Sequence, residues 1–344
     1  MTNNAPEPDI AAIRQLLLAA FTPEDLRRFC YDRPDFRLVG RRFSPRHNLE
    51  DMVDELIAYC ENFLLFHKLL AELKQHNPSQ YTRFLEPELS ADERNASTPE
   101  ILTISYPISL HLVCVPTGEF QMGSFMSRDE EALDDELPPH PVNVPEFRIS
   151  RYLVTNRQYQ AFVQATGHQA PNHWEKGRIP HRKQSHPVVW VTWNDAVAFC
   201  TWLCRETERA FRLPTEAEWE KAARGTDGRI YPWGDDPPDG GRCNFGKNVG
   251  DSSTIGRYSP QGDGPYGCAD MAGNVWEWCQ SLYEPYPYQE GDGRENPQAR
   301  GSRVLRGGAW YVDPASVRCA FRGRLQPGDK GSGNGFRVAA GPLG

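Results

Sequence analysis

The sequence lacks the features that would place it in a membrane, on a nucleic acid or outside the cell. It contains no run of about 18 uncharged apolar residues, so no membrane-spanning helix is expected. Its start, MTNNAPEPDIAAIRQ, has neither a basic stretch nor an apolar core before a cleavage site, so we expect no secretory signal and a cytoplasmic protein. The net charge of −8 argues against nucleic acid or an anionic membrane as partner, because both require a basic surface.

The cysteines also lack the spacing of a metal site. None of the nine forms a C-x-x-C pair, and Cys200 and Cys204 are four residues apart, as on one face of a helix. A chain of 344 residues can build an apolar core without disulfides. Most of these cysteines are therefore expected to be small buried apolar side chains.

Residues 1–85 have the pattern of a small all-α bundle. Thr22 and Pro23 mark a helix start, with a capping hydroxyl before a proline at the first helical position. Apolar residues recur at helical spacing from 48 to 74 without Gly or Pro, which predicts one long helix there. The polar, acidic and proline-bounded stretch that follows predicts a linker over residues 86–104.

The remainder, residues 105–344, has the pattern of an irregular α+β domain. Gly, Pro and Trp are frequent, apolar runs are short, and turn signals come every few residues. Three helices are predicted by capping boxes, and they begin after Thr155, Thr192 and Thr215.

Six motifs in this second part resemble the formylglycine-generating-enzyme, or sulfatase-modifying-factor, family. They are WNDAVAFCTWLC from Trp193, RLPTEAEWEKAARG from Arg212, YPWG from Tyr231, YGCADMAGNVWEW from Tyr266, RVLRGGAW from Arg303 and NGFRVA from Asn334. They occur in the family's order over about residues 105 to 340. The resemblance implies a C-type-lectin-like α+β fold for residues 105–344.

The reactive groups of that family are missing. The resemblance implies an oxidase with two cysteines, which bind copper in the aerobic enzymes. The first stands two positions after the aromatic residue of the GGAW motif, where this chain has Val312, and no cysteine occurs between Asp313 and Arg318. The motif's serine is Ala309. Valine is neither a thiolate nucleophile nor a soft copper ligand. We therefore expect no oxidase activity and no copper.

The stretch from Asp270 to Glu277 offers hard oxygen ligands at calcium-like spacing. The resemblance implies a structural calcium ion held by the side chains of Asp270 and Glu277 and the carbonyls of Gly273 and Val275. The alternative is that Glu277 pairs with an arginine and Asp270 caps a turn. A second family calcium site would involve Asn244, but the loop that follows it is short.

The stretch between Tyr311 and Gly333 is loop-like and lies between the GGAW and NGFRV motifs, and loops on a rigid scaffold often carry recognition. It resembles the region that is diversified in variable proteins of diversity-generating retroelements, which implies a ligand-binding face. The alternative is an ordinary, undiversified loop. With the aromatic residue of GGAW, the predicted contact positions are Trp310, Tyr311, Val312, Asp313, Ala315, Ser316, Phe321, Gly323, Leu325 and Gln326.

The resemblance also assigns residues to the scaffold. Arg318, Arg322 and Arg337 match family positions that tie loops to carboxylates. Cys319 matches the structural partner of Cys200, so the two are expected side by side and reduced.

Residues 1–85 resemble the effector-associated or death-like adaptor domains of bacterial conflict systems, in the opening IRQLLLAAF from Ile13 and around Phe29. Such domains have no active site, so this part is expected to recruit an effector protein or to self-associate.

The leading hypothesis is thus a non-catalytic binding protein, with an unknown ligand at the 311–333 face and an effector coupled through the N-terminal domain. One alternative is an enzyme of the same family with altered chemistry, and another is a scaffold for one fixed partner. Five histidines between residues 134 and 187 could supply such chemistry, but none has H-x-x-x-H spacing on a clear helix. They are His140, His168, His173, His181 and His186.

Overall fold

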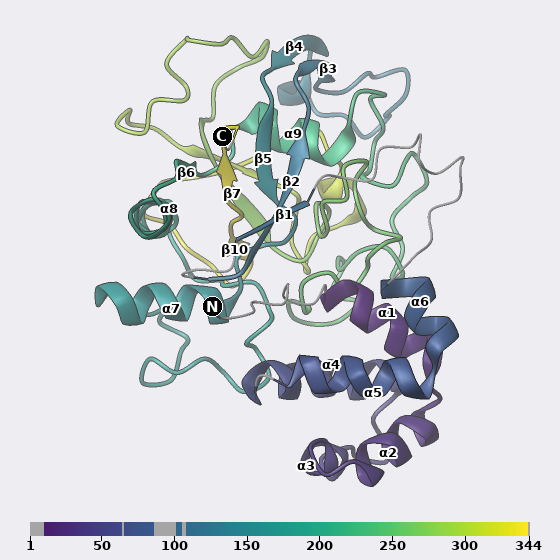
Figure 1. Cartoon of the computed structure of the whole chain (residues 1–344). Coiled ribbons are helices and arrows are strands. Elements are labelled where there is room, and N and C mark those ends of the chain that lie inside the picture. Colours follow the sequence, from purple (N-terminus) through teal and green to yellow (C-terminus); the bar gives the residue numbers. More distant parts are fainter. Residues whose placement is uncertain (1–9, 64, 86–100, 105–107, 343–344) are drawn as a thin grey trace. The chain divides into compact units, whose positions relative to one another are not determined.

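Two units of different secondary structure make up the chain (Figure 1). The structure, a computed structural model, describes residues 10–63, 65–85, 101–104 and 108–342, and the units are Met1–Thr98 and Pro99–Gly344. The boundary falls inside the predicted linker, but that linker extends too far. Residues Ile101–Ile104 form a strand, β1, which pairs with β2 (Leu110–Val115) and belongs to the second unit.

The described part of the first unit is helical. Thr22 accepts a hydrogen bond from the backbone N–H of Asp25 at 3.2 Å and caps the second helix, with Pro23 at its first position, as predicted. The helices are α1 (Ile10–Ala20), α2 (Pro23–Asp32), α3 (Arg37–Gly40), α4 (Leu49–Phe63), α5 (Phe66–His76) and α6 (Pro78–Leu85).

The prediction of one helix over residues 48–74 is wrong. The chain breaks between α4 and α5, where the N–H of Leu65 bonds to the carbonyl of Cys60, five residues back, at 2.8 Å. Leu56 of α4 and Leu69 of α5 are both fully buried in one core cluster. Apolar residues continue at helical spacing through the break, so the periodic pattern cannot show where the chain turns. The turn lets both apolar faces pack into that core, which stabilises helices of this length.

The second unit is an α+β domain with three sheets. The first has the strand order β1-β2-β5-β11-β6, the second β10-β7-β8-β9, and the third is the pair β3-β4. The strands are β1 (Ile101–Ile104), β2 (Leu110–Val115), β3 (Gly118–Met122), β4 (His140–Val144), β5 (Phe147–Ser150), β6 (Phe211–Arg212), β7 (Trp276–Leu282), β8 (Arg303–Arg306), β9 (Gly323–Leu325), β10 (Asn334–Gly335) and β11 (Ala339–Ala340).

All three predicted capping boxes are present in this unit. Thr155, Thr192 and Thr215 each accept a hydrogen bond from the third helical residue, whose side chain bonds back to the threonine N–H. They begin the helices α7 (Asn156–Thr166), α8 (Trp193–Thr207) and α9 (Glu216–Arg224), and two short 3₁₀ turns are η1 (Asp134–Glu136) and η2 (Pro314–Val317).

The core of the second unit has two main apolar clusters. One packs α7 and α8 against β6, around Phe199 and Phe336, and the other surrounds Trp219 of α9, which is fully buried. Cys200 lies in the first cluster and Cys319 in the second, and both are free thiols. The expectation that these two cysteines lie side by side is therefore wrong.

No helix in the described parts of the chain is long and apolar enough to cross a membrane.

Candidate ligand-binding site

The GGAW segment makes a tight corner at the end of β8. Gly307 and Gly308 have φ values of +89° and +76°, a region that side chains rarely adopt. A Cβ on Gly308 would lie 2.7 Å from the carbonyl oxygen of Ser316 and 2.8 Å from a methyl of Val317. This close approach requires glycine, and it holds the start of the 311–333 stretch against η2.

Two valines meet at this corner, at the positions of the family's two cysteines. Val312 is the first position, and five residues on, the second is Val317. Their methyl groups lie 3.2 Å and 2.8 Å from the Cβ position of Gly308. Both belong to an apolar cluster with Tyr231 and Cys243. Burial raises the pKa of the Cys243 thiol to about 12, so this neighbour is a protonated thiol and not a nucleophile at neutral pH.

Three of the predicted contact positions, Tyr311, Phe321 and Gly323, lie near Trp276, which the sequence analysis placed only within the YGCADMAGNVWEW motif. The Trp276 ring lies 5.8 Å from that of Phe321, and its edge is 3.3 Å from the Cβ position of Gly323. Its side chain also lies near that of Tyr311, and burial raises the pKa of the Tyr311 hydroxyl. Trp276 reaches this place because β10 pairs with β7 in parallel, with Asn334 opposite Trp276, a pairing that no local pattern reveals.

The face contains further aromatic surface. Trp310 and Tyr311 pack edge to face at 5.1 Å, and Gly333 lies directly against the Tyr311 ring. Trp190, 37% exposed, donates its backbone N–H to the carbonyl of Gly331 at 2.9 Å. Sequence reasoning missed Trp190, which no pattern placed near residue 331.

The ten predicted residues differ in exposure, but none is buried. Tyr311, Asp313 and Gln326 are exposed, and Gln326 bonds to Ser302 at 3.0 Å, away from Trp276. Half-buried positions are Trp310, Val312, Ala315, Ser316, Phe321, Gly323 and Leu325.

Backbone hydrogen bonds hold the first part of this stretch in place. The carbonyls of Trp310 and Val312 accept from the N–H groups of Lys247 and Gly246, at 2.7 and 2.8 Å. The Trp310 N–H donates to the carbonyl of Asn274 at 2.9 Å. Two neighbouring segments, at Gly246–Lys247 and at Asn274, therefore hold the backbone of this stretch in place.

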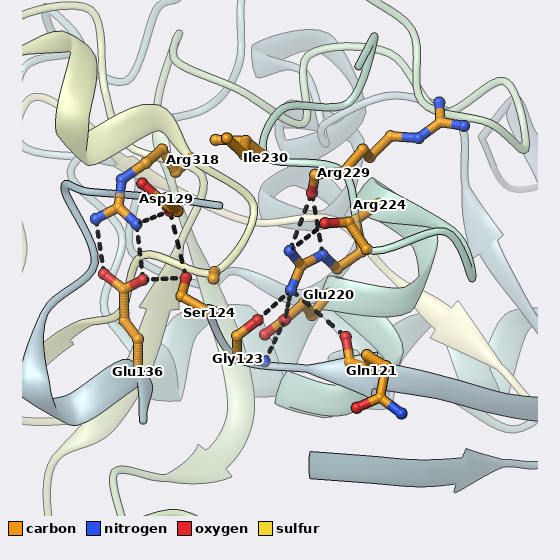
Figure 2. Close-up of polar contacts among 12 residues, drawn as sticks. Gln121, Gly123, Ser124, Asp129, Glu136, Glu220, Arg224, Arg229, Ile230 and Arg318 are labelled. Carbon is orange, nitrogen blue, oxygen red and sulfur yellow. Dashed lines mark hydrogen bonds and ion pairs between the residues drawn. The ribbon is translucent and has the colours of Figure 1, made fainter. Parts of the chain in front are cut away.

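Arg318 anchors the far side of η2. Figure 2 shows its guanidinium reaching Glu136 and Asp129, and both contacts are 2.7 Å. Burial acts to lower the pKa of Arg318, but the bonds to these carboxylates outweigh it and raise that pKa. In the same view the Arg224 guanidinium donates hydrogen bonds to the carboxylate of Glu220 and to the carbonyl of Gly123.

Arg322 and Arg337 also form ion pairs with buried glutamates. The Arg322 guanidinium pairs with Glu216 at 2.7 and 3.0 Å, and Arg337 pairs with Glu277 at 2.6 and 2.8 Å. The prediction that Arg318, Arg322 and Arg337 tie loops to carboxylates is confirmed.

The contacts of Glu277 bear on the predicted calcium site. Both of its oxygens accept hydrogen bonds, from Arg337 and from the indole N–H of Trp219 at 3.0 Å. Asp270 accepts from the N–H of Gly256 at 2.7 Å, and burial raises its pKa to about 6. Glu277 thus does what the alternative predicted, and the quartet of Asp270, Gly273, Val275 and Glu277 does not fit calcium in this arrangement.

Asn244, at the second family calcium position, is fully buried. Its amide donates to the carbonyl of Asp251 at 2.9 Å, while its side-chain oxygen has no hydrogen-bond partner. An unpartnered buried amide oxygen suits a hard cation better than the ion-paired Glu277 does. Calcium is therefore not expected at the quartet of Asp270 and Glu277, and calcium near Asn244 stays a prediction.

Three of the five histidines are held in scaffold contacts. His140 accepts from the Tyr288 N–H at 2.8 Å, and His168 contacts Asp195 at 2.8 Å. His186 lies 3.2 Å from both Lys183 and Ser252, and burial followed by the Lys183 charge lowers its pKa to about 3. A base this weak is a poor general base at neutral pH. The described residues contain no group of three His, Cys, Asp or Glu side chains able to hold a metal.

These features define a C-type-lectin-like α+β domain with a supported aromatic face where the family keeps its cysteines. The model of the sulfatase-modifying factor enzyme 1-like domain matches residues 108–341, and the chain belongs to this family.

Proteins of similar sequence include several enzymes. The formylglycine-generating enzyme of Streptomyces coelicolor is 35% identical over 66% of this chain and 88% of its own length. Hercynine oxygenase of Mycolicibacterium smegmatis is 31% identical over 66% of this chain, and the serine/threonine-protein kinase pkn1 of Chlamydia pneumoniae is 36% identical over 68%. This chain spans only 60% and 38% of their lengths.

Two solved structures share the fold. PvdO from Pseudomonas aeruginosa has a TM-score of 0.59 and 26% identity, covering 72% of this chain and 99% of its own. Treponema denticola variable protein 1 has a TM-score of 0.56 and 24% identity, covering 71% and 100%.

Proposed function

We propose that this chain is a non-catalytic binding protein whose ligand contacts the face around Trp276 and Tyr311. The observation that carries the proposal is the burial pattern of residues 311–326. All nine positions predicted there as variable are exposed or half-buried, whereas five residues between them are buried. The buried residues are Val317, Arg318, Cys319, Ala320 and Arg322.

Such a division allows the surface to change while the scaffold stays constant. Exposed substitutions away from core contacts usually change stability by less than about 0.5 kcal/mol, whereas core changes cost several times more. The pattern supports diversification of the nine positions, and the variable protein of Treponema denticola shows that the fold occurs in a protein of that description.

The chemistry of the face also supports binding. Val312, Val317 and Ala309 present only hydrocarbon at the positions where the family has two cysteines and a serine. The exposed side chains around them are aromatic or polar, as in paratopes that combine rigid anchors with adaptable contacts. A protein ligand suits this composition, because Trp and Tyr are enriched at the centres of protein interfaces. We propose further that the N-terminal unit couples this binding to an effector protein.

The rival function, oxidation of a cysteine, has a direct test. The chain is incubated with copper, oxygen and a sulfatase-type cysteine peptide, with the Streptomyces coelicolor enzyme as positive control, and the peptide mass is measured. We expect no conversion of cysteine to formylglycine. Conversion above that of a buffer blank would contradict the proposal.

Diversification has its own test in the gene. We expect a nearby reverse-transcriptase gene and a second copy of the codons for residues 311–333 that differs only at adenines. A neighbourhood without either would leave a binding face of fixed sequence, and the nine positions would then be ordinary loop residues.

A further inference from the structure

The segment from residue 27 to residue 46 is strongly basic. It contains seven arginines, no lysine and only two aspartates, which gives a local charge of +5. One of the aspartates, Asp35, is paired with Lys68 at 2.8 Å. The net charge of −8, on which the expectation against a nucleic-acid partner rests, averages over the whole chain and conceals this segment. Because a ligand responds to the local field, a basic surface on one unit can bind a polyanion although the chain as a whole is acidic.

Five of these arginines are available for a ligand. Arg33 pairs with Glu72 at 2.5 Å, and Arg27 donates to the carbonyl of Ser44 at 3.0 Å, so these two serve the fold. The other five are exposed, and among the described residues no carboxylate forms an ion pair with any of them. They are Arg28, Arg37, Arg41, Arg42 and Arg46.

Tyr31 lies among these arginines. It is 62% exposed, the highest value among the large apolar residues of the described chain. The Arg37 side chain donates to the Tyr31 carbonyl at 2.9 Å, and its guanidinium carbon is 5.6 Å from the centre of the Tyr31 ring. On α2, Arg28 precedes Tyr31 by three residues and is therefore its neighbour on the helix surface. The ring thus has one arginine of its own helix and one of α3 beside it.

The short helix α3 continues this surface. It packs directly on α2, since the Cβ position of Gly40 is 3.0 Å from the Cβ of Cys30 (Figure 1). Arg41 follows Arg37 by about one helical turn and has helical backbone angles, and Leu38 is 57% exposed. We call this set of residues the α2–α3 surface, and it consists of Arg28, Tyr31, Arg37, Leu38 and Arg41.

Two features distinguish the α2–α3 surface from a basic helix face that is merely solvated. Tyr31 and Leu38 give it exposed apolar contact area, which a solvated face does not need. All of its cations are arginines, whose planar guanidinium groups bind phosphate oxygens through pairs of hydrogen bonds and stack on rings. Together these features fit a ligand that carries both repeated phosphates and accessible rings.

We propose that the α2–α3 surface binds single-stranded nucleic acid. The arginines contact successive phosphates, and an unpaired base stacks on the Tyr31 ring, an arrangement found in proteins that bind single strands with little sequence preference. A duplex fits less well, because its bases are stacked inside and leave the ring without a partner. An anionic membrane also fits less well, since it requires a long amphipathic helix, and α3 has four residues. The inference concerns the first unit and does not depend on what the second unit binds.

Fluorescence anisotropy with the full-length chain and a labelled thymidine oligonucleotide of about 12 nucleotides tests the proposal. We expect binding at 50 mM salt that weakens about a hundredfold or more at 500 mM. The reason is that contacts to three or four phosphates give a slope of about −2 to −3 when the logarithm of the binding constant is plotted against that of the salt concentration. A duplex of the same length should bind at least about fivefold more weakly, because it offers no base to the ring.

Two pairs of variants separate the arginines from the ring. R37E/R41E should weaken binding about tenfold or more and make the salt slope shallower, whereas R37K/R41K keeps the charges and should stay within about threefold of the native chain. Tyr31→Ala should weaken binding about tenfold through loss of base stacking, while Tyr31→Phe should bind like the native chain. The matched control, K176E/R209E, makes the same charge change as R37E/R41E at exposed positions of the second unit and should bind normally. Circular dichroism checks that each variant is folded.

A native chain that does not bind the oligonucleotide would overturn the proposal, and so would equal binding by R37E/R41E. Inorganic polyphosphate or the duplex bound as tightly as the single strand, with no change in Tyr31→Ala, would contradict it by showing a surface for any polyanion. Binding of phosphatidylserine vesicles in place of the oligonucleotide, lost in R37E/R41E, would assign the surface to a membrane instead. Formylglycine formation tests a different unit and would leave this result unchanged.

Discussion

The segment 311–326 contains buried residues and predicted contact positions, and the two sets differ in burial and in the residues that they contact. Val317, Arg318, Cys319, Ala320 and Arg322 are buried, and their partners come from distant parts of the chain, such as Glu136 for Arg318. The contact positions are at least partly exposed, and of these Val312 and Leu325 also pack against apolar clusters. The comparison shows how a face can vary on a constant fold, because the residues that determine the backbone are not those that point outward.

The same comparison explains why the loss of cysteine chemistry need not disturb the fold. Val317 fills the corner beside Gly308, and Val312 packs in the same apolar cluster. Two hydrocarbon side chains there contribute packing without any charge or metal.

The largest loss in the free energy of unfolding is expected from Arg318→Met. The substitution leaves the fully buried Glu136 and the nearby Asp129 without their cation, and unpaired buried charges cost about 3–5 kcal/mol. Urea unfolding measures the change in the free energy of unfolding. Arg324→Met is the matched control, because Arg324 is exposed and should cost less than about 1 kcal/mol. Equal losses in the free energy of unfolding for the two variants would contradict the expectation that the buried arginine stabilises the fold more than the exposed one.

Asp270 should make the free energy of unfolding depend on pH by up to about 3 kcal/mol, because it is a buried carboxylate without an arginine partner of its own. Burial raises its pKa from 3.8 to about 6 in the folded chain. The stability it contributes is therefore present below pH 3.8 and is lost as the pH rises to 6. Asp270→Asn should be more stable than the native chain at pH 7 and similar to it at pH 4, as measured by urea unfolding. An equal difference at both pH values would contradict this.

A smaller loss is expected from Val317→Ala than from Arg318→Met. Removing two methyl groups from a fully buried site costs about 2 kcal/mol, including the cavity left behind. Val312→Ala, at a half-buried position of the same cluster, should cost less than about 1 kcal/mol. Thermal unfolding of the pair gives the comparison, and a larger loss at Val312 would show that the face is part of the core.

The smallest effect is expected from removing calcium. Glu277 already accepts hydrogen bonds at both oxygens, so EDTA should shift the melting temperature by less than about 1 °C. A clear fall that added calcium reverses would instead show a bound ion, and the loss of that fall in Asn244→Ala would place it at the second position.

Much of the fold could be predicted from local sequence signals. The three capping boxes gave the helices after Thr155, Thr192 and Thr215, because each box is a contact within four residues. The order of the six motifs predicted the fold of residues 105–344. The match of Arg318, Arg322 and Arg337 to family positions predicted that they tie loops to carboxylates. The break near Leu65 could not be predicted, because the apolar spacing continues through it. The separation of Cys200 from Cys319 depends on how the two clusters pack, which no local pattern shows.

The candidate site was predicted in part. The ten contact positions follow from where the loop lies between two motifs, and their burial is consistent with a face. Trp276 and Trp190 were missed, because they reach the face only through the pairing of β10 with β7 and the hydrogen bond to Gly331.

The most direct test is a pair of libraries displayed on cells. One randomises the nine positions Tyr311, Val312, Asp313, Ala315, Ser316, Phe321, Gly323, Leu325 and Gln326, and the other randomises the five buried residues between them. The fraction of protease-resistant clones measures how many still fold. The account predicts that most clones of the first library resist protease and few of the second do. Similar fractions in the two libraries would contradict the claim that a variable binding face is built on a constant scaffold.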